Sequence, residues 1–289
     1  MIYEPAKLPS MRIGSKLFEW GSRTFIMGVV NATPDSFSGD GVVDDPGNIQ
    51  RAVDQALRME DQGADIIDIG GESTRPVSVY PDAKPVSEDN EINRVIPLIE
   101  ALIDRLEVPI SIDTRKAGVV RAAVAAGASL ANDVSLLGDP EMAETVSESQ
   151  TPIVLSHIRD GGHGSGVVND VLSDLDTAIQ LLETAGLSRN RIICDPGIGF
   201  AKKPDQSLSI LRATSRLRDE LETPILIGTS RKSFIGAVTD KPVDKRIFGT
   251  AASIAWTIGQ GADIVRVHDV AEMIDVVKLA DALQRGWDG

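Results

Sequence analysis

The sequence has a single cysteine and no long apolar run. Cys194 lies in an apolar stretch between Ile193 and Asp195, which predicts a buried core side chain, and one cysteine excludes an intrachain disulfide. No apolar run approaches the ~20 residues that a membrane-spanning helix needs. The first residues also lack the basic flank and apolar block of a signal peptide. We therefore expect a soluble cytoplasmic protein in a reducing compartment, with no membrane partner.

Positive charge is scarce in this chain. It has 29 Lys and Arg against 43 Asp and Glu, a formal net charge of −14 at pH 7. Such a chain repels nucleic acids and anionic lipids, so neither is an expected partner. Any anionic small molecule would have to be held by local Arg and Lys side chains against this overall field.

Linkers rich in proline or serine are also absent, so the 289 residues, 42% of them hydrophobic, are expected to fold around one large core. From residue 25 onward, short β-rich runs alternate with amphipathic helical patterns. The expected strands are residues 25–30, 65–69, 110–112, 130–134, 153–156, 191–194, 225–227 and 264–267. Eight βα units predict an α/β fold, a TIM (β/α)8 barrel over residues 25–289. The alternative, an open doubly wound sheet, is disfavoured because no Gly-x-Gly-x-x-Gly follows the first strand.

Two shorter patterns support this organisation. Residues 1–24 contain two apolar pieces about Gly14 and Ser15, which predicts an N-terminal β-hairpin that plugs one end of the barrel. The chain also enters its strands in an alternating way, because Gly-Ala precedes strands two, four and eight whereas Val-Pro or Thr-Pro precedes strands three, five and seven. This alternation indicates a (βα)2 unit used four times.

Polar residues stand where the predicted strands end. In a (β/α)8 barrel these ends meet at one mouth, where the functional site lies. Carboxylates and an amide, which suit a heterocycle with several N–H donors, are expected at depth at Asp113, Asn132 and Asp195. Basic side chains, which suit a phosphate or pyrophosphate, are expected nearer the rim at Arg75, Lys232, Arg266 and His268. The mouth should therefore bind a polar ring with an anion above it.

Several of these residues have an equally simple structural interpretation. Asp113 can cap the helix that follows it, and Arg115 and Lys116 can be solvated residues of that helix. A metal pair of His157 and His163 is disfavoured against a flexible loop because few other ligands accompany them. The acidic residues 82–91 are expected to form solvated loop and helix start, with Ser87 as the N-cap.

The loop at residues 31–41 follows the first strand and is unusually rich in functional groups. Pro34 fixes one φ angle, while Gly39 and Gly41 free others. A loop that is rigid at its base and flexible at its tip is typical of an active-site lid. We therefore expect this loop to close over a bound ligand.

These segments closely resemble the dihydropteroate synthase family, whose fold is a (β/α)8 barrel. The resemblance runs from about residue 25 to the last helix and is carried by residues 27–38, 68–76, 111–116, 132–135, 195–200, 230–236 and 266–269. It implies a transferase of folate biosynthesis that condenses 6-hydroxymethyl-7,8-dihydropterin diphosphate with 4-aminobenzoate. The products are 7,8-dihydropteroate and pyrophosphate, formed through a cationic pterin intermediate. It also implies a homodimer that sulfonamides inhibit.

The resemblance further implies a role for each matching residue. The pterin ring would be bound by Asp113, Asn132, Asp195 and Lys232, and Asp35 would help to stabilise charge on the pterin side. The diphosphate would be bound by Asn31, Arg266 and His268, with Mg²⁺ near Asn31. The aminobenzoate site would be shaped by Phe37, Thr74, Arg75, Pro76, Phe200 and Ser233. The catalytic set is then Asp35, Asp113, Asp195 and Lys232.

The chain departs from the family pattern in places. Val77 stands where the family has a glycine, residues 77–84 form a longer segment than usual, and Ser156 begins a stretch that replaces a Met-rich run. These changes put the shape of the second loop in question, rather than the reaction.

Two alternative functions share the same barrel. One is a pterin-binding methyltransferase of the methyltetrahydrofolate–corrinoid type, which Lys232 and the Thr-Pro-Asp-Ser-Phe loop disfavour. The other is a divergent paralogue that binds pterin without synthase activity. It is disfavoured because the site residues are intact, namely Asp113, Asp195, Lys232 and Arg266.

Overall fold

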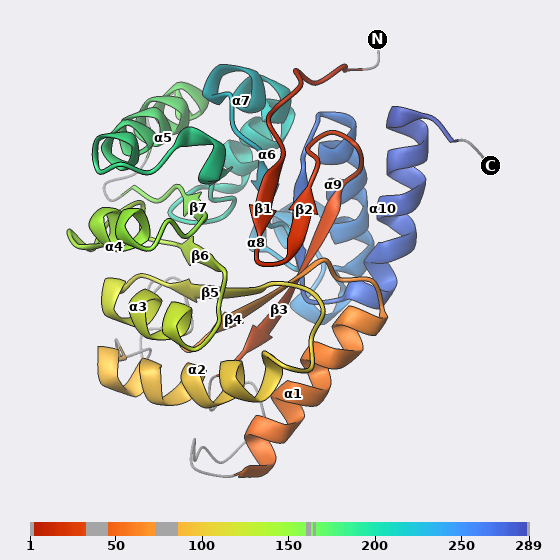
Figure 1. Ribbon diagram of the computed structural model, residues 1–289. Coiled ribbons are helices and arrows are strands. Elements are labelled where there is room, and N and C mark those ends of the chain that lie inside the picture. Colours follow the sequence, from red (N-terminus) through yellow and green to blue (C-terminus); the bar gives the residue numbers. More distant parts are fainter. Residues whose placement is uncertain (1–2, 33–45, 73–85, 160–162, 164–165, 288–289) are drawn as a thin grey trace.

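The computed structural model describes residues 3–32, 46–72, 86–159, 163 and 166–287 (Figure 1). Eight parallel strands form one sheet in the order β8-β7-β6-β5-β4-β3-β10-β9. Their bounds are β3 (Phe25–Asn31), β4 (Ile66–Gly70), β5 (Ile110–Thr114), β6 (Leu130–Asp133), β7 (Ile153–Ser156), β8 (Ile192–Asp195), β9 (Leu226–Ile227) and β10 (Ile264–Val267).

The two outer strands of this sheet, β8 and β9, also meet. Cys194 and Ile225 form a parallel bridge, and the backbone N–H of Cys194 donates to the carbonyl of Pro224 at 2.9 Å. The sheet is therefore a nearly closed barrel, and the predicted (β/α)8 fold is confirmed. Each predicted strand is present with its bounds shifted by two residues at most. Cys194 is fully buried, as predicted.

Helices surround the barrel and follow one another around it from α1 in orange to α10 in blue (Figure 1). Their bounds are α1 (Pro46–Asp61), α2 (Glu88–Leu102), α3 (Ala117–Ala125), α4 (Met142–Glu148), α5 (Val167–Thr184), α6 (Pro204–Arg212), α7 (Thr214–Leu221), α8 (Ser233–Thr239), α9 (Ile247–Gly259) and α10 (Val270–Arg285). Apolar stripes at helical spacing, such as Leu175, Ile179 and Leu182 of α5, are buried against the strands. Across the ranges described, none of these helices combines the length and apolarity that crossing a membrane requires.

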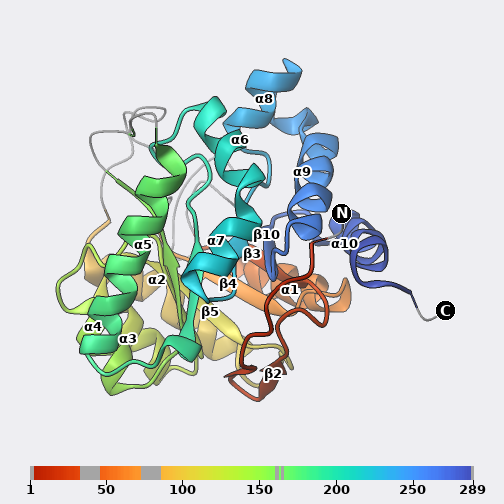
Figure 2. The same cartoon turned by 90° about the horizontal axis from the view of Figure 1, so that it is seen from above.

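The predicted N-terminal hairpin consists of β1 (Met11–Ile13) and β2 (Lys16–Phe18), which pair antiparallel about Gly14. Its buried side chains pack against residues at the beginnings of the barrel strands, including Phe25, Ile66 and Ile264. Figure 2 shows β2 at the end of the molecule away from α8. The hairpin therefore closes the end of the barrel where the strands begin.

The barrel interior changes character along the strands. Successive residues of a strand point to opposite faces, so residues two apart share one face. Near the strand starts this face is apolar, at Ile66, Leu130, Val154, Ile193 and Ile264. Two positions further on it is polar, at Asp68, Asn132, Ser156, Asp195 and Arg266. An apolar floor thus supports a polar layer at the carboxyl ends of the strands, which is where the site of a (β/α)8 barrel lies.

Candidate active site

The centre of the polar layer is a cluster of four side chains from four strands. Arg266 on β10 donates from Nε to Asp68 Oδ2 on β4 at 2.6 Å and from Nη2 to Asp113 Oδ2 on β5. Asn132 on β6 donates from Nδ2 to the same oxygen of Asp68 at 3.0 Å. Asp68, Asp113 and Asn132 are buried, whereas the side chain of Arg266 is 19% exposed. The cluster thus joins strands that are far apart in the sequence.

Burial sets the charges in this cluster. It raises the pKa of Asp113 to about 7, and the neighbouring carboxylates of Asp68 and Glu91 add to the shift while Arg266 opposes it. Burial alone would lower the pKa of Arg266, but the carboxylates of Asp68 and Asp113 raise it above its usual value. Arg266 is therefore a permanent cation, and Asp113 changes its protonation state near neutral pH.

Three acceptor oxygens of this layer lack a hydrogen-bond partner within the described part of the chain. They are Asp68 Oδ1, Asp113 Oδ1 and Asn132 Oδ1. Leaving such a buried group unpaired costs about 1–3 kcal/mol, so it is uncommon without a functional reason. A flat ligand that presents several N–H donors would satisfy these oxygens.

Asp195 lies at the end of β8, on the opposite side of the polar layer. Its Oδ1 accepts from the backbone N–H of Gly197 at 2.8 Å, and its Oδ2 accepts from Ser156 Oγ at 3.4 Å. Gly197 has φ +68°, and a Cβ at this position would lie 1.9 Å from the carbonyl oxygen of His157. Only glycine therefore allows this turn to hold the Asp195 carboxylate.

Lys232 and Phe200 form the next part of the mouth. Lys232 Nζ lies 4.5 Å from the centre of the Phe200 ring and donates to the carbonyl of Ile198. Burial lowers the pKa of Lys232 to about 8, and Arg266 contributes in the same direction, while Asp195 and Asp113 oppose it. Ser233, the first residue of α8, is exposed beside Lys232.

His268 and Asn31 lie at the ends of the neighbouring strands β10 and β3. Nδ1 of His268 is 2.9 Å from Ser230 Oγ, and its backbone N–H also reaches this hydroxyl, at 3.3 Å. Asn31 is partly buried and lies opposite Gly70 in the register of β3 with β4. Its amide oxygen is a ligand type that Mg²⁺ accepts.

The structure thus brings together nine of the residues that the sequence singled out, at the carboxyl ends of the strands: Asn31, Asp113, Asn132, Asp195, Phe200, Lys232, Ser233, Arg266 and His268. The others, Asp35, Phe37, Thr74, Arg75 and Pro76, lie outside the described residues, as does Val77. So does the tip of the expected lid at residues 33–41.

One expectation about depth is wrong. The sequence predicts Arg266 nearer the rim with the other basic residues, yet its guanidinium is bound to two buried carboxylates. The reason is that Arg266 follows Ile264 by two positions on the interior face of β10, which places it one pleat above the apolar floor.

A second expectation also needs correction. Lys116 is not simply solvated, because its Nζ donates to Glu72 at 2.6 Å and to Glu91 at 2.5 Å. Glu91 is fully buried, although the sequence assigned it to a solvated helix start. Burial is tolerated because Lys116 neutralises the carboxylate. Ser87 does cap α2, as predicted, since its Oγ accepts from the backbone N–H of Asn90 at 3.3 Å.

The two histidines considered as a metal pair are neighbours in the structure. The rings of His157 and His163 lie 5.3 Å apart. Among residues of the described ranges, no group of three or more His, Cys, Asp or Glu could hold a metal ion. The Nδ1 of His157 is instead 2.9 Å from Lys202 Nζ.

Two residues of the site were missed by sequence reasoning. In the sequence, Asp68 is indicated only by the resemblance, although a carboxylate within the apolar run of residues 66–69 is a usable signal. Lys202 is buried beneath the loop that follows β8, and its neighbour Lys203, of the same type, is exposed. No sequence pattern distinguishes these two lysines.

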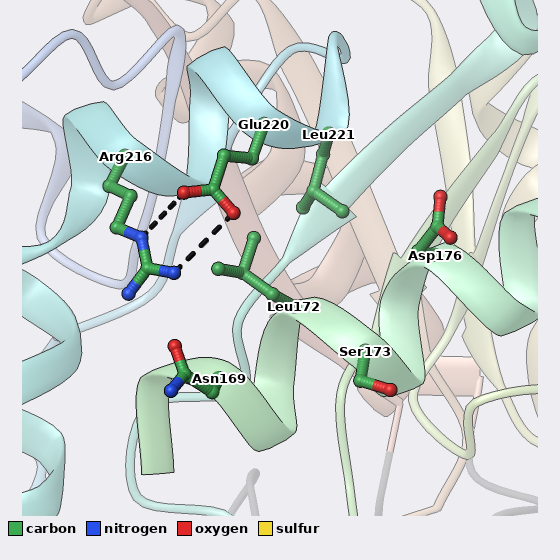
Figure 3. Close-up of a pocket in the computed structure, with 7 residues that line it drawn as sticks. All are labelled: Asn169, Leu172, Ser173, Asp176, Arg216, Glu220 and Leu221. Carbon is green, nitrogen blue, oxygen red and sulfur yellow. Dashed lines mark hydrogen bonds and ion pairs between the residues drawn. The ribbon is translucent and has the colours of Figure 1, made fainter. Parts of the chain in front are cut away.

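A separate groove of about 400 Å³ lies between α5 and α7 in the outer helical layer (Figure 3). It is lined by Asn169, Leu172, Ser173, Asp176, Arg216, Glu220 and Leu221. Arg216 and Glu220 form an ion pair of 2.6 Å within α7. None of the residues of the strand ends lines this groove, so it is distinct from the site at the mouth.

Comparison with known proteins agrees with this geometry. The model of a family described as pterin binding enzyme matches residues 27–268. A dihydropteroate synthase of Clostridium beijerinckii is 45% identical, over 95% of this chain and 100% of the relative. The crystal structure of a dihydropteroate synthase from Clostridium difficile, determined in the presence of pteroic acid, has a TM-score of 0.87 and 41% identity. The match covers 93% of this chain and 99% of the Clostridium difficile chain. The structure of a Xanthomonas albilineans dihydropteroate synthase with 4-aminobenzoic acid has a TM-score of 0.88 and 38% identity. The match covers 96% of this chain and 99% of the Xanthomonas chain. The chain belongs to the pterin-binding enzyme family, and within it to the dihydropteroate synthases.

Proposed function

We propose that this protein condenses 6-hydroxymethyl-7,8-dihydropterin diphosphate with 4-aminobenzoate to give 7,8-dihydropteroate and pyrophosphate. The observation that carries this function is the polar layer above the apolar floor. Its three unpaired acceptor oxygens, on Asp68, Asp113 and Asn132, match a flat heterocycle with N–H donors along its edge, as a pterin has. The similarity to dihydropteroate synthases over nearly the whole chain supports the same reaction.

The pterin ring is proposed to lie against this layer. Asp113 and Asn132 would accept from its N–H groups, while Asp195 and Lys232 hold its other edge. Asp195 is already oriented by Ser156 and the backbone of Gly197, so its carboxylate needs little rearrangement when the ring binds.

The diphosphate is proposed to lie above the ring, toward Arg266, His268 and Asn31. Arg266 binds the two carboxylates through Nε and Nη2, so Nη1 is the nitrogen that it would offer to the diphosphate. Mg²⁺ is usually held by one or two protein oxygens together with substrate phosphates, and the single amide oxygen of Asn31 at the end of β3 fits such a site. When bound, the ion would neutralise charge on the leaving pyrophosphate.

The chemistry then needs electrostatics and positioning. The bond between the pterin methylene and the diphosphate oxygen breaks, and both electrons leave with pyrophosphate. The carboxylates of Asp195 and Asp113, and of Asp35 as an expectation, stabilise the cationic methylene that remains. The amine of 4-aminobenzoate forms the new C–N bond and loses one proton, which passes to the released pyrophosphate or to water. Its site is proposed to include Phe200 and Ser233, with Phe37, Thr74, Arg75 and Pro76.

We also propose that the enzyme is a homodimer. Large apolar side chains are exposed at helical spacing on two adjacent helices, at Phe248 and Trp256 of α9 and at Leu279 and Leu283 of α10. Patches of this kind mark protein interfaces. Sedimentation equilibrium should give twice the chain mass, and a Phe248→Glu variant should shift the mass toward one chain. A monomeric wild-type protein at micromolar concentration would contradict this.

Two further parts of the proposal concern inhibition and location. Sulfonamides should compete with 4-aminobenzoate because they present the same arylamine, and a purely noncompetitive pattern would contradict a shared site. A cytoplasmic location stays a prediction, which cell fractionation tests.

One assay tests the reaction. The purified protein is supplied with the pterin diphosphate, Mg²⁺ and 4-aminobenzoate, and dihydropteroate is measured by mass spectrometry while pyrophosphate is measured by its hydrolysis to phosphate. Equimolar formation of the two products supports the synthase. Pterin binding without product would support the divergent paralogue, and methyl transfer from methyltetrahydrofolate to a corrinoid would support the methyltransferase.

A further inference from the structure

Lys202 is a buried lysine that the proposed reaction does not use. Lysine is rarely buried without an ionic partner, yet none of the hydrogen bonds of Lys202 in the described part of the chain goes to a carboxylate. Its Nζ donates to the backbone carbonyls of Gly197 at 2.9 Å, His157 at 3.2 Å and Phe200 at 3.2 Å. It also lies 2.9 Å from Nδ1 of His157. Every donor of the ammonium group therefore has an acceptor.

The orientation of His157 is fixed from its other side. Its Nε2 lies 3.0 Å from Asp174 Oδ2, and Arg159 binds Asp174 through two hydrogen bonds of 2.8 and 2.7 Å. Burial, together with the Lys202 cation, lowers the pKa of His157 to about 4. The ring is thus neutral at pH 7, with the Nε2 proton donated to Asp174 and Nδ1 free to accept from Lys202.

The segment that Lys202 holds is a loop with demanding backbone geometry. Between β8 and α6, Gly197 has φ +68°, Gly199 has φ +80° and Ala201 has φ +48°. For a residue with a Cβ, such as Ala201, the left-handed region costs about 1–2 kcal/mol. Backbone of this kind persists only where its surroundings hold it. Lys202 supplies that support, because it binds carbonyls near both ends of the loop.

The other face of the same loop lines the mouth of the barrel. Lys232 binds the carbonyl of Ile198 and lies over the ring of Phe200. The loop is therefore held between two lysines: the buried Lys202 binds Gly197 and Phe200, and Lys232 binds Ile198 between them. The conformation of this loop therefore determines the position of the Phe200 ring. The three unpaired acceptors proposed for the pterin lie instead on β4, β5 and β6, with Arg266 as their neighbour. Asp195 and Lys232, proposed at the other edge of the ring, do contact this loop.

We propose that Lys202 is a positioning residue that, through His157 and the loop carbonyls, places Phe200 for the arylamine substrate. The arylamine half of the site then depends on Lys202 more strongly than the pterin half does. The inference relies on the proposed function only for the identity of the two substrates.

The test compares Lys202→Met, which keeps the length of the side chain and removes the ammonium, with Lys203→Met at the exposed neighbouring lysine. For Lys202→Met we expect the KM for 4-aminobenzoate to rise at least tenfold, while the Kd for 6-hydroxymethylpterin, measured by calorimetry, changes less than threefold. Lys202→Arg should recover part of the loss because it restores N–H donors. Lys203→Met should behave as the wild type.

A second measurement does not depend on turnover. Hydrogen exchange followed by mass spectrometry should show faster exchange confined to residues 196–203 in Lys202→Met, and none in Lys203→Met. Should Lys202→Met fail to fold, Lys202→Gln takes its place with the same expected split. A KM for 4-aminobenzoate within twofold of wild type, equal losses of both affinities, a uniform rise in exchange, or failure of Lys202→Gln to fold would overturn the inference. A wild-type protein without synthase activity would overturn the proposed reaction instead, and the exchange result would still decide the role of Lys202.

Discussion

Arg266 Nε and Asp68 Oδ2 lie 2.6 Å apart, and this contact joins the last strand of the barrel to the second. The same carboxylate oxygen accepts from Asn132 at 3.0 Å. Asp68 is thus the common partner of a cation and an amide that are both proposed to bind substrate. Its own side chain is fully buried, so in addition to offering its unpaired Oδ1 to the ring, Asp68 holds the other two residues in place.

The first prediction concerns Asp68→Asn, which keeps the shape of the side chain and removes its charge. Arg266 would lose one ionic partner and keep Asp113, so we expect a loss of about 1–3 kcal/mol in the free energy of unfolding. The Kd for 6-hydroxymethylpterin should rise about tenfold, which corresponds to ~1.4 kcal/mol. Urea unfolding and calorimetry measure these quantities. Asp61→Asn, at an exposed position, is the control. An unchanged Kd for 6-hydroxymethylpterin in Asp68→Asn would show that Asp68 does not support pterin binding.

The second prediction is a pH dependence of stability that comes from Asp113. Burial raises its pKa from 3.8 to about 7, so the folded protein binds more protons than the unfolded chain between these values. The stability that this group contributes is complete below about pH 4 and is lost as the pH rises through about 7. Between pH 5 and pH 8, the wild type should therefore lose stability relative to Asp113→Asn. The difference between their free energies of unfolding should change by up to about 3 kcal/mol in favour of the variant. Parallel curves for the two proteins would mean that the pKa of Asp113 is not raised.

The third prediction concerns Lys232→Ala and Asp195→Asn. Each removes a charge that is proposed to act on the pterin, so kcat should fall at least about 100-fold, or ~3 kcal/mol of transition-state stabilisation. Neither change leaves a large apolar cavity, so the Tm should stay within about 2 °C of wild type. Steady-state kinetics and scanning calorimetry provide both values. Lys203→Ala is the control, and a large drop in Tm with modest kinetic change would assign these residues a structural role.

The fourth prediction separates the floor of the barrel from its mouth. Phe18 is buried, and its ring centre lies 4.7 Å from that of Phe25 and 5.7 Å from that of Trp20. Phe18→Ala should lower the free energy of unfolding by about 3–5 kcal/mol. The KM values should stay within twofold at a temperature where the variant is folded. Leu17→Ala, whose side chain is exposed on the same strand, should change stability by less than about 0.5 kcal/mol.

Much of this architecture could be predicted from the chain, because it rests on local patterns. The eight strands follow from apolar runs set apart by helical stripes, and the hairpin follows from two apolar pieces about Gly14. The convergence of Asp113, Asn132 and Asp195 follows from one rule of barrel geometry. These inferences need only the periodicity of single elements and the position of strand ends.

The remainder depends on contacts between distant segments. The pairing of Arg266 with Asp68 spans 198 positions, and its geometry depends on the strand register around a closed barrel. The burial of Glu91 and Lys202 depends on partners, Lys116 in one case and loop carbonyls in the other, that no local pattern indicates. Identical neighbours such as Lys202 and Lys203 are distinguished only by which one faces the core.

The polar layer above the apolar floor is proposed to bind the pterin ring. A crystal structure with bound 6-hydroxymethylpterin decides whether it does. We expect ring N–H donors to lie about 2.7–3.2 Å from Asp113 Oδ1 and Asn132 Oδ1, with Asp195 and Lys232 at another edge of the ring. A ring bound elsewhere, with these two oxygens still unpaired, would show that the polar layer is not the pterin site.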